Sequence, residues 1–148
     1  RLAQLGLAAS IQPQHAMDDR DVIARFWGTP AGIPYAFNSL HKAGTKLLMG
    51  SDAPVAPLDP WLAISAAVFG TESSDREPFQ PEQCLDFETA LASSTAVGRV
   101  ALRDADAADL VLLDCDPSII DSPEAMRAMP EHVLGTMLAG RWTYQQAE

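Results

Sequence analysis

One carboxylate stands where a parallel α/β fold usually places its chemistry. The apolar run 46–49 leads into Gly50, Ser51 and Asp52, and Pro54 then stops the strand from continuing. This pattern predicts a short buried strand with Asp52 at its carboxyl end, where the loops of parallel sheets converge on a crevice. Asp52 can act as a catalytic group there. The alternative is that it only caps the turn, as Asp beside Gly and Pro often does.

Further polar side chains follow an earlier apolar run. Residues 7–12 predict another buried strand, which Pro13 ends, and His15 comes two positions later. If both strands belong to one parallel sheet, a right-handed crossover places their carboxyl ends together. Gln12 and His15 then open onto the same edge as Asp52. A lone His in a loop is more often an ordinary surface residue.

Helical segments separate and follow these two strands. We expect helices over 18–27, over 34–43, from Asp59 with Pro60 in its first turn, and from Asp86 onward. The apolar residues of the first helix are expected on one face: Val22, Ile23, Phe26 and Trp27. Tyr35 lies at the start of the second helix, and its ring is expected to pack in the core.

The character of the sequence changes near residue 100. Residues 108–114 predict a strand, 121–130 a short helix or turn, and 132–144 two strands joined by a hairpin at Ala139 and Gly140. The chain is therefore expected to divide into βα units over residues 1–100 and a small β segment over 101–148.

Length, charge and cysteine content exclude several classes of protein. A chain of 148 residues can bury the core of one modest domain, but it is shorter than the ~250 residues typical of an eightfold barrel. The net charge of −10 argues against a nucleic-acid partner, which needs a basic face. Cys84 and Cys115 lie far apart, so reduced thiols and a cytoplasmic location are expected. No apolar run approaches the ~20 residues that span a bilayer. The sequence starts at Arg1 without Met, so we expect it to be a piece of a longer protein.

The segment LLMGSDAPV, followed by LDPWLAISAAV, resembles the last barrel strand and the next helix of the amidohydrolase superfamily. The most similar branch is the group of metal-dependent enzymes that includes N-substituted formamide deformylases. Further matching segments occur in the same order along the chain, at 10–16, 34–47, 88–96, 108–117 and 133–144. Together they cover nearly the whole chain and correspond to the C-terminal third of such an enzyme.

The resemblance implies an α/β fold made of the last strands and helices of a TIM-type (β/α) barrel, followed by part of a composite β-sandwich. It implies a fragment of a metal-dependent hydrolase that cleaves carbon–nitrogen amide bonds, other than peptide bonds, in a small-molecule substrate. In that family the aspartate matched by Asp52 is a weak metal ligand and moves a proton from a metal-bound water to the leaving nitrogen. His15 and Gln12 are then expected on the substrate side, and Tyr35 can line the pocket.

Most ligands of such a metal site are not found in this sequence. The family uses a His-x-His pair and further histidines, whereas this chain has three histidines, at 15, 41 and 132, and no two are spaced to chelate together. One carboxylate cannot hold a catalytic zinc, which usually takes three protein ligands. We therefore expect zinc in the longer parent, no tightly bound metal in this chain, and no activity from this chain alone.

An open piece of barrel leaves strand edges and apolar helix faces uncovered. The chain is therefore expected to self-associate, or to pack against the missing N-terminal part of the barrel. Two other functions stay open. One is a non-catalytic α/β remnant or interaction module, and the other is a ring deaminase of the same superfamily.

Overall fold

The computed structural model describes residues 1–28, 32–95 and 106–147. Its first sheet contains two parallel strands, β1 (Ala8–Ile11) and β2 (Lys46–Met49). Ile11 pairs with Met49, and the backbone N–H of Gly50 donates to the carbonyl of Ile11 at 3.0 Å. The predicted parallel pairing is therefore confirmed, and both carboxyl ends lie on the same edge of the sheet.

The α-helices of the described ranges are α1 (Pro13–Val22), α2 (Phe37–Lys42), α3 (Pro60–Phe69), α4 (Phe87–Ser94) and α5 (Pro123–Arg127). A π-helical segment, Ile23–Trp27, continues α1, and short 3-10 turns occupy Ala3–Leu5, Pro81–Gln83, Pro117–Ile119 and Met129–His132. Caps confirm two predicted helix starts. The Asp59 carboxylate accepts from the N–H of Trp61 at 2.9 Å, and the Asp86 carboxylate accepts from the N–H of Thr89 at 2.8 Å. None of these helices has the length and apolar character needed to cross a bilayer.

The helix after β1 begins earlier than the sequence pattern predicts. Asp18 or Asp19 is the predicted start, whereas α1 begins at Pro13, directly after Gln12. Proline suits the first helical position because its missing N–H would have no partner there. His15 therefore lies in the first turn of α1 rather than in a loop.

The apolar face expected at the end of this helix is largely uncovered. Ile23 is 6% exposed, whereas Phe26 is 68% and Trp27 62% exposed. The end of the helix therefore presents largely exposed aromatic surface, although the Arg25 guanidinium lies over the Phe26 ring, 5.1 Å from its centroid.

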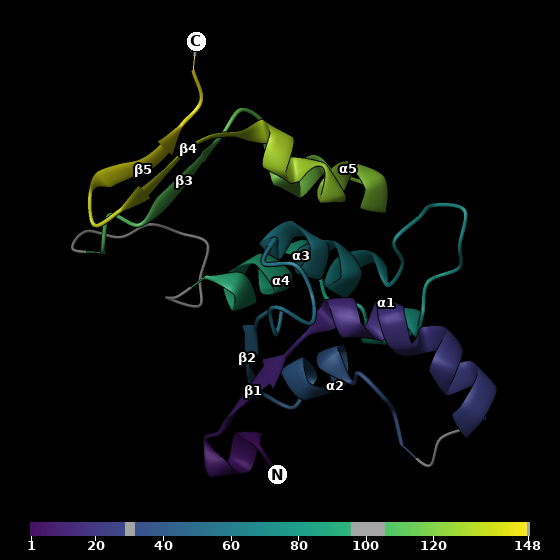
Figure 1. The fold of residues 1–148 in the computed structure, drawn as a ribbon. Coiled ribbons are helices and arrows are strands. Elements are labelled where there is room, and N and C mark those ends of the chain that lie inside the picture. Colours follow the sequence, from purple (N-terminus) through teal and green to yellow (C-terminus); the bar gives the residue numbers. More distant parts are fainter. Residues whose placement is uncertain (29–31, 96–105, 148) are drawn as a thin grey trace.

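The core is built around α3, against which α1, α4 and α5 pack (Figure 1). Ile64 of α3 is 1% exposed, and the small side chains of Ser65 and Ala67 are equally buried and let neighbouring helices approach closely. The Ser65 hydroxyl donates to the carbonyl of Pro123 at 3.3 Å, which joins α3 to α5.

The C-terminal segment contributes to this same core. Met126 of α5 and Met129 just after it are completely buried among residues of the N-terminal segment. The predicted boundary near residue 100 lies within 96–105, outside the described residues. The division into segments 1–100 and 101–148 stays a prediction.

The loop after α3 is tied to helices on both sides of it. Arg76 forms an ion pair with Asp21 of α1. The Glu124 carboxylate of α5 accepts from the backbone N–H of Ser74 at 2.6 Å and from its hydroxyl at 2.7 Å. These bonds connect the loop to the first and last helices of the described chain.

The second sheet is antiparallel, with the order β3 (Leu110–Leu113), β4 (Val133–Leu138) and β5 (Arg141–Gln145). In Figure 1 it lies to one side of the packed helices. The predicted hairpin is confirmed, and its turn residues Ala139 and Gly140 have φ values of 48° and 76°. All residues of β5 are exposed, so this small sheet does not enclose a core of its own.

Candidate functional site

Asp52 follows the carboxyl end of β2 in a left-handed conformation, with φ 59°. Asp tolerates this region better than most residues do. The carbonyl of Asp52 accepts from the N–H of Val55 at 2.9 Å, so the backbone closes the turn. Its side chain is exposed, and the described part of the chain offers no hydrogen bond to the carboxylate. The carboxylate is therefore available to a ligand.

Gln12 and His15 lie beside that edge, as the parallel pairing requires. The Gln12 amide donates to the Ser10 hydroxyl at 3.1 Å, which turns it back along β1. His15 is half-buried, and its Nε2 atom is fully buried with no hydrogen-bond partner among the described residues. Because a buried polar nitrogen without a partner is costly, this atom calls for a partner from elsewhere.

Tyr35 has a different set of contacts. Its hydroxyl donates to the Asp19 carboxylate on α1, and its ring meets Phe37 edge-to-face with centroids 5.9 Å apart. Partial burial, followed by the bond to Asp19, raises the pKa of the Tyr35 phenol. These contacts connect the turn before α2 to α1 and the core. A role for Tyr35 in lining a substrate pocket stays a prediction.

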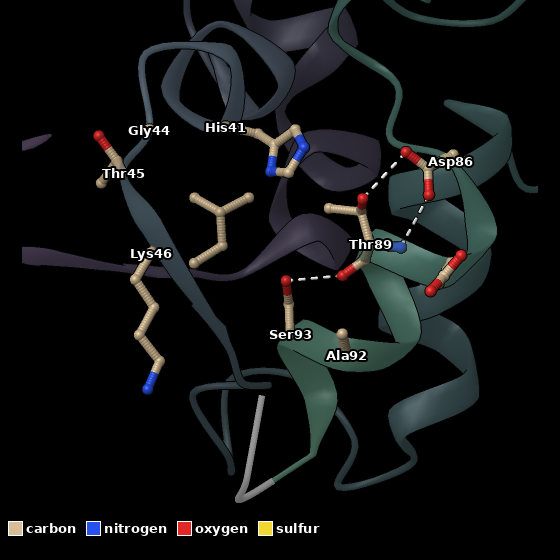
Figure 2. Close-up of a pocket in the computed structure, with 10 residues that line it drawn as sticks. His41, Gly44, Thr45, Lys46, Asp86, Thr89, Ala92 and Ser93 are labelled. Carbon is tan, nitrogen blue, oxygen red and sulfur yellow. Dashed lines mark hydrogen bonds between the residues drawn. The ribbon is translucent and has the colours of Figure 1, made fainter. Parts of the chain in front are cut away.

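An open hollow of about 660 Å³ lies beside the other end of β2 (Figure 2). Its polar lining comes from His41, Thr45, Lys46, Asp86, Glu88, Thr89 and Ser93. Several of these groups already bond to one another. Asp86 caps α4 through Thr89, and the Ser93 hydroxyl donates to the Thr89 carbonyl at 2.7 Å. The hollow adjoins the amino end of β2, opposite Asp52, and its carboxylate at Asp86 serves a helix cap.

A second group of ligand-type atoms lies where β3 leads toward β4. The Asp114 carboxylate and Nδ1 of His132 are 2.8 Å apart, and the Asp114 N–H donates to the His132 carbonyl at 3.1 Å. The sulfur of Cys115 completes a set in which all three ligand atoms lie within 4.8 Å of one another. Partial burial, followed by the carboxylates of Asp114 and Asp116, raises the pKa of the Cys115 thiol.

No spacing motif in the sequence marks this second group. Antiparallel pairing creates it: Leu113 at the end of β3 pairs with Val133 at the start of β4. The residues just beyond each strand end therefore meet. The sequence predicts strand 108–114 and the hairpin over 132–144 but assigns no partner to strand 108–114, so this pairing is known only from the structure.

Residues 1–144 match the model of the amidohydrolase family. The chain is 30% identical over 155 residues to Protein LONG AFTER FAR-RED 3 of Arabidopsis thaliana, covering 97% of this chain and 26% of that protein. It is 26% identical over 159 residues to Putative amidohydrolase YtcJ of Bacillus subtilis strain 168, covering 99% of this chain and 30% of that protein.

A solved structure is also similar. The crystal structure of an uncharacterized metal-dependent hydrolase from Pyrococcus horikoshii OT3 matches with a TM-score of 0.53 and 27% identity, over 66% of this chain and 20% of that one. These findings confirm the predicted superfamily and a mixed α/β fragment of it. The chain spans between a quarter and a third of the curated relatives it matches.

Proposed function

Since this chain belongs to the amidohydrolase family, we propose that it forms part of a metal-dependent hydrolase that cleaves carbon–nitrogen amide bonds in small molecules. Two similar proteins support this proposal, one called a putative amidohydrolase and the other a metal-dependent hydrolase. Because the chain spans only 26–30% of its curated relatives, most of the proposed active site lies in other segments. Within the family we propose the branch that includes N-substituted formamide deformylases, and therefore N-substituted formamides as the first substrates to test.

The observation that carries the proposal is the free carboxylate of Asp52 at the carboxyl end of β2. A divalent cation, with zinc proposed, would polarise the amide carbonyl and lower the pKa of a bound water. Asp52 would accept a proton on its carboxylate and pass it to the leaving nitrogen, as a general base and then a general acid. Its exposure and its lack of a hydrogen bond to the carboxylate among the described residues fit that task.

This chain can supply only part of the ligand set of the catalytic metal. Catalytic zinc usually takes three protein ligands, and Asp52 is the one ligand that we assign at this edge. The remaining ligands belong, in this proposal, to segments outside the chain. His15 and Gln12 are proposed on the substrate side, since both follow the carboxyl end of β1 at this edge.

The two sheets of this chain are, in this proposal, parts of larger sheets. We propose that β1 and β2 are the last two strands of a TIM-type barrel, and that the β3–β5 sheet completes a small sandwich with strands from elsewhere. In the described residues the first sheet has two strands only, so each has an edge without a partner strand. Exposed edges and the largely exposed rings of Phe26 and Trp27 support packing against the rest of the barrel or against a second copy.

The test uses the longer parent protein. Metal analysis is combined with a hydrolysis screen over N-acyl, N-formyl and cyclic amide substrates, before and after removal of metal by a chelator. We expect at least one stoichiometric divalent metal per chain and amide hydrolysis that the chelator abolishes and the metal restores. A parent without metal and without hydrolysis would instead indicate a non-catalytic α/β module, and ammonia release from ring substrates alone would indicate a deaminase.

A further inference from the structure

The corner between β3 and β4 brings together donor atoms that the proposed hydrolysis does not use. Asp114 and Cys115 follow β3, and His132 directly precedes β4. Cys115 and His132 are half-buried and Asp114 is exposed, so the group is open to solvent on one side. A fourth atom lies close to it, because the thioether sulfur of the buried Met129 is 3.8 Å from the Cys115 sulfur.

The spacing of these atoms is close to that of ligands around one metal ion. On tetrahedral zinc, nitrogen and oxygen ligands lie roughly 3.3 Å apart, and a sulfur ligand lies roughly 3.6 Å from either. The Asp114 oxygen and the His132 nitrogen are 2.8 Å apart, and the three ligand atoms all lie within 4.8 Å of one another. Small side-chain rotations that separate the first pair and draw in the sulfur therefore suffice.

We propose that Cys115, His132 and Asp114 form a Zn²⁺ site with three protein ligands at the β3–β4 corner. A thiolate and an imidazole favour a borderline-soft cation over Mg²⁺ or Ca²⁺, which prefer oxygen ligands alone. The local charge is negative and favours a cation, since the carboxylates of Asp114 and Asp116 lie next to the thiol. On binding the cation, Cys115 would coordinate as the thiolate and release its proton to the buffer, and His132 would coordinate through Nδ1 as the neutral ring, with its one ring proton on Nε2.

The fold gives such an ion a structural consequence. Met129–His132 is a 3-10 turn that leads from α5 into β4, and Met129 is anchored in the main core. A cation on Cys115 and His132 would lock the end of β3 to this turn. It would thereby fix the outlying three-stranded sheet to the helical core at the place where the two meet.

The test replaces zinc with Co²⁺, whose bond to a thiolate gives a charge-transfer absorption. Difference spectra and metal content are recorded for the intact protein, reduced, and for two variants, Cys115→Ser and His132→Gln. Matched controls are Cys84→Ser, which removes the other thiol, and His41→Gln, which removes an exposed imidazole on α2. Circular dichroism verifies the fold of each protein.

We expect the thiolate–cobalt band, and one metal ion per chain, to be lost in Cys115→Ser and lost or strongly reduced in His132→Gln. Both controls should keep the band and the ion. Equal metal content and equal spectra in Cys115→Ser and the unchanged protein would overturn the proposal. So would loss of the band in Cys84→Ser, or an unchanged band in His132→Gln, because the site requires both ligands.

Discussion

The edge formed by β1 and β2 and the corner between β3 and β4 are the two places where we propose chemistry, and they are built in opposite ways. The edge is marked by motifs in the sequence. Among the described residues it holds the Asp52 carboxylate, which has no hydrogen bond there, and a half-buried His15 whose Nε2 has no partner there. The corner has no motif, yet three ligand atoms meet within 4.8 Å. In these two proposals, a sequence motif marks a site that other segments complete, whereas antiparallel pairing assembles a site within the chain.

The largest effect is expected at the edge, from Asp52→Asn in the longer parent. The substitution keeps the shape of the side chain and removes its basicity, and general acid–base assistance is typically worth about 10²–10⁴-fold in rate. We expect kcat to fall by that factor with little change in melting temperature. The matched control is Asp59→Asn, because Asn caps a helix about as well as Asp and leaves turnover intact. Unchanged turnover with lower thermal stability in Asp52→Asn would make Asp52 a turn residue.

A second prediction contrasts the two regions through their glycines. A Cβ on Gly135 in β4 would lie 2.7 Å from a ring carbon of Trp142 and 3.2 Å from the carbonyl oxygen of Tyr144. A Cβ on Gly50 would meet no atom of the described residues within 4 Å. We expect Gly135→Ala to lower the free energy of unfolding by about 1–3 kcal/mol, as overpacking usually does. Gly50→Ala should change it by less than about 0.5 kcal/mol.

Urea denaturation of both glycine variants measures this difference. Equal losses in the two variants would show that the backbone at Gly50 is as crowded as that in β4. The edge of the first sheet would then be a closed structural element rather than an open one.

Local signals along the sequence were sufficient for much of the fold. Asp59 and Asp86 confirm their predicted caps, the two apolar runs pair in parallel, and Ala139-Gly140 forms the predicted hairpin turn. Each of these depends on residues close in sequence or on one simple pairing rule. The start of α1 was wrong by several residues, because Pro13 was interpreted as the end of a strand and it also begins a helix.

Tertiary contacts account for what local signals missed. The sequence gives Phe26 and Trp27 an apolar face, but their exposure depends on which segments surround them. The group at Asp114, Cys115 and His132 depends on the register of β3 against β4. Asp52 is predicted from its position after a strand, and the structure adds that its carboxylate has no hydrogen bond among the described residues. Its catalytic role stays a prediction.

A third, smaller effect concerns the cap of α3, the helix that supports the edge. The Asp59 carboxylate accepts from the N–H of Trp61 at 2.9 Å, and Ala cannot replace that bond. We expect Asp59→Ala to cost about 1 kcal/mol of stability, within the usual range for a lost N-cap. Asp59→Asn should be nearly neutral in the same urea titration. A loss of similar size in both variants would show that the charge, rather than the cap bond, stabilises α3.

The smallest effect concerns the connection between the two regions, which runs from the loop after α3 to α5. The backbone N–H of Ser74, followed by its hydroxyl, lowers the pKa of the Glu124 carboxyl from 4.5 to about 2. Because the folded pKa is the lower one, the stabilisation is fully present above pH 4.5 and is lost as the pH falls toward 2. Glu124→Gln should therefore have a lower free energy of unfolding than the unchanged protein at pH 7. This difference in free energy should be smaller at pH 3.

Urea titrations at pH 7 and pH 3 measure this difference in free energy of unfolding. Glu131→Gln is the control, because Glu131 is exposed. The change in stability with pH for Glu124→Gln is measured against the change for this control. A constant difference for Glu124→Gln would mean that the Ser74 bonds do not distinguish the charged carboxylate from a neutral acceptor. A narrowing difference would instead show that the Ser74 bonds favour the charged carboxylate, and that this charge stabilises the contact between the loop after α3 and α5.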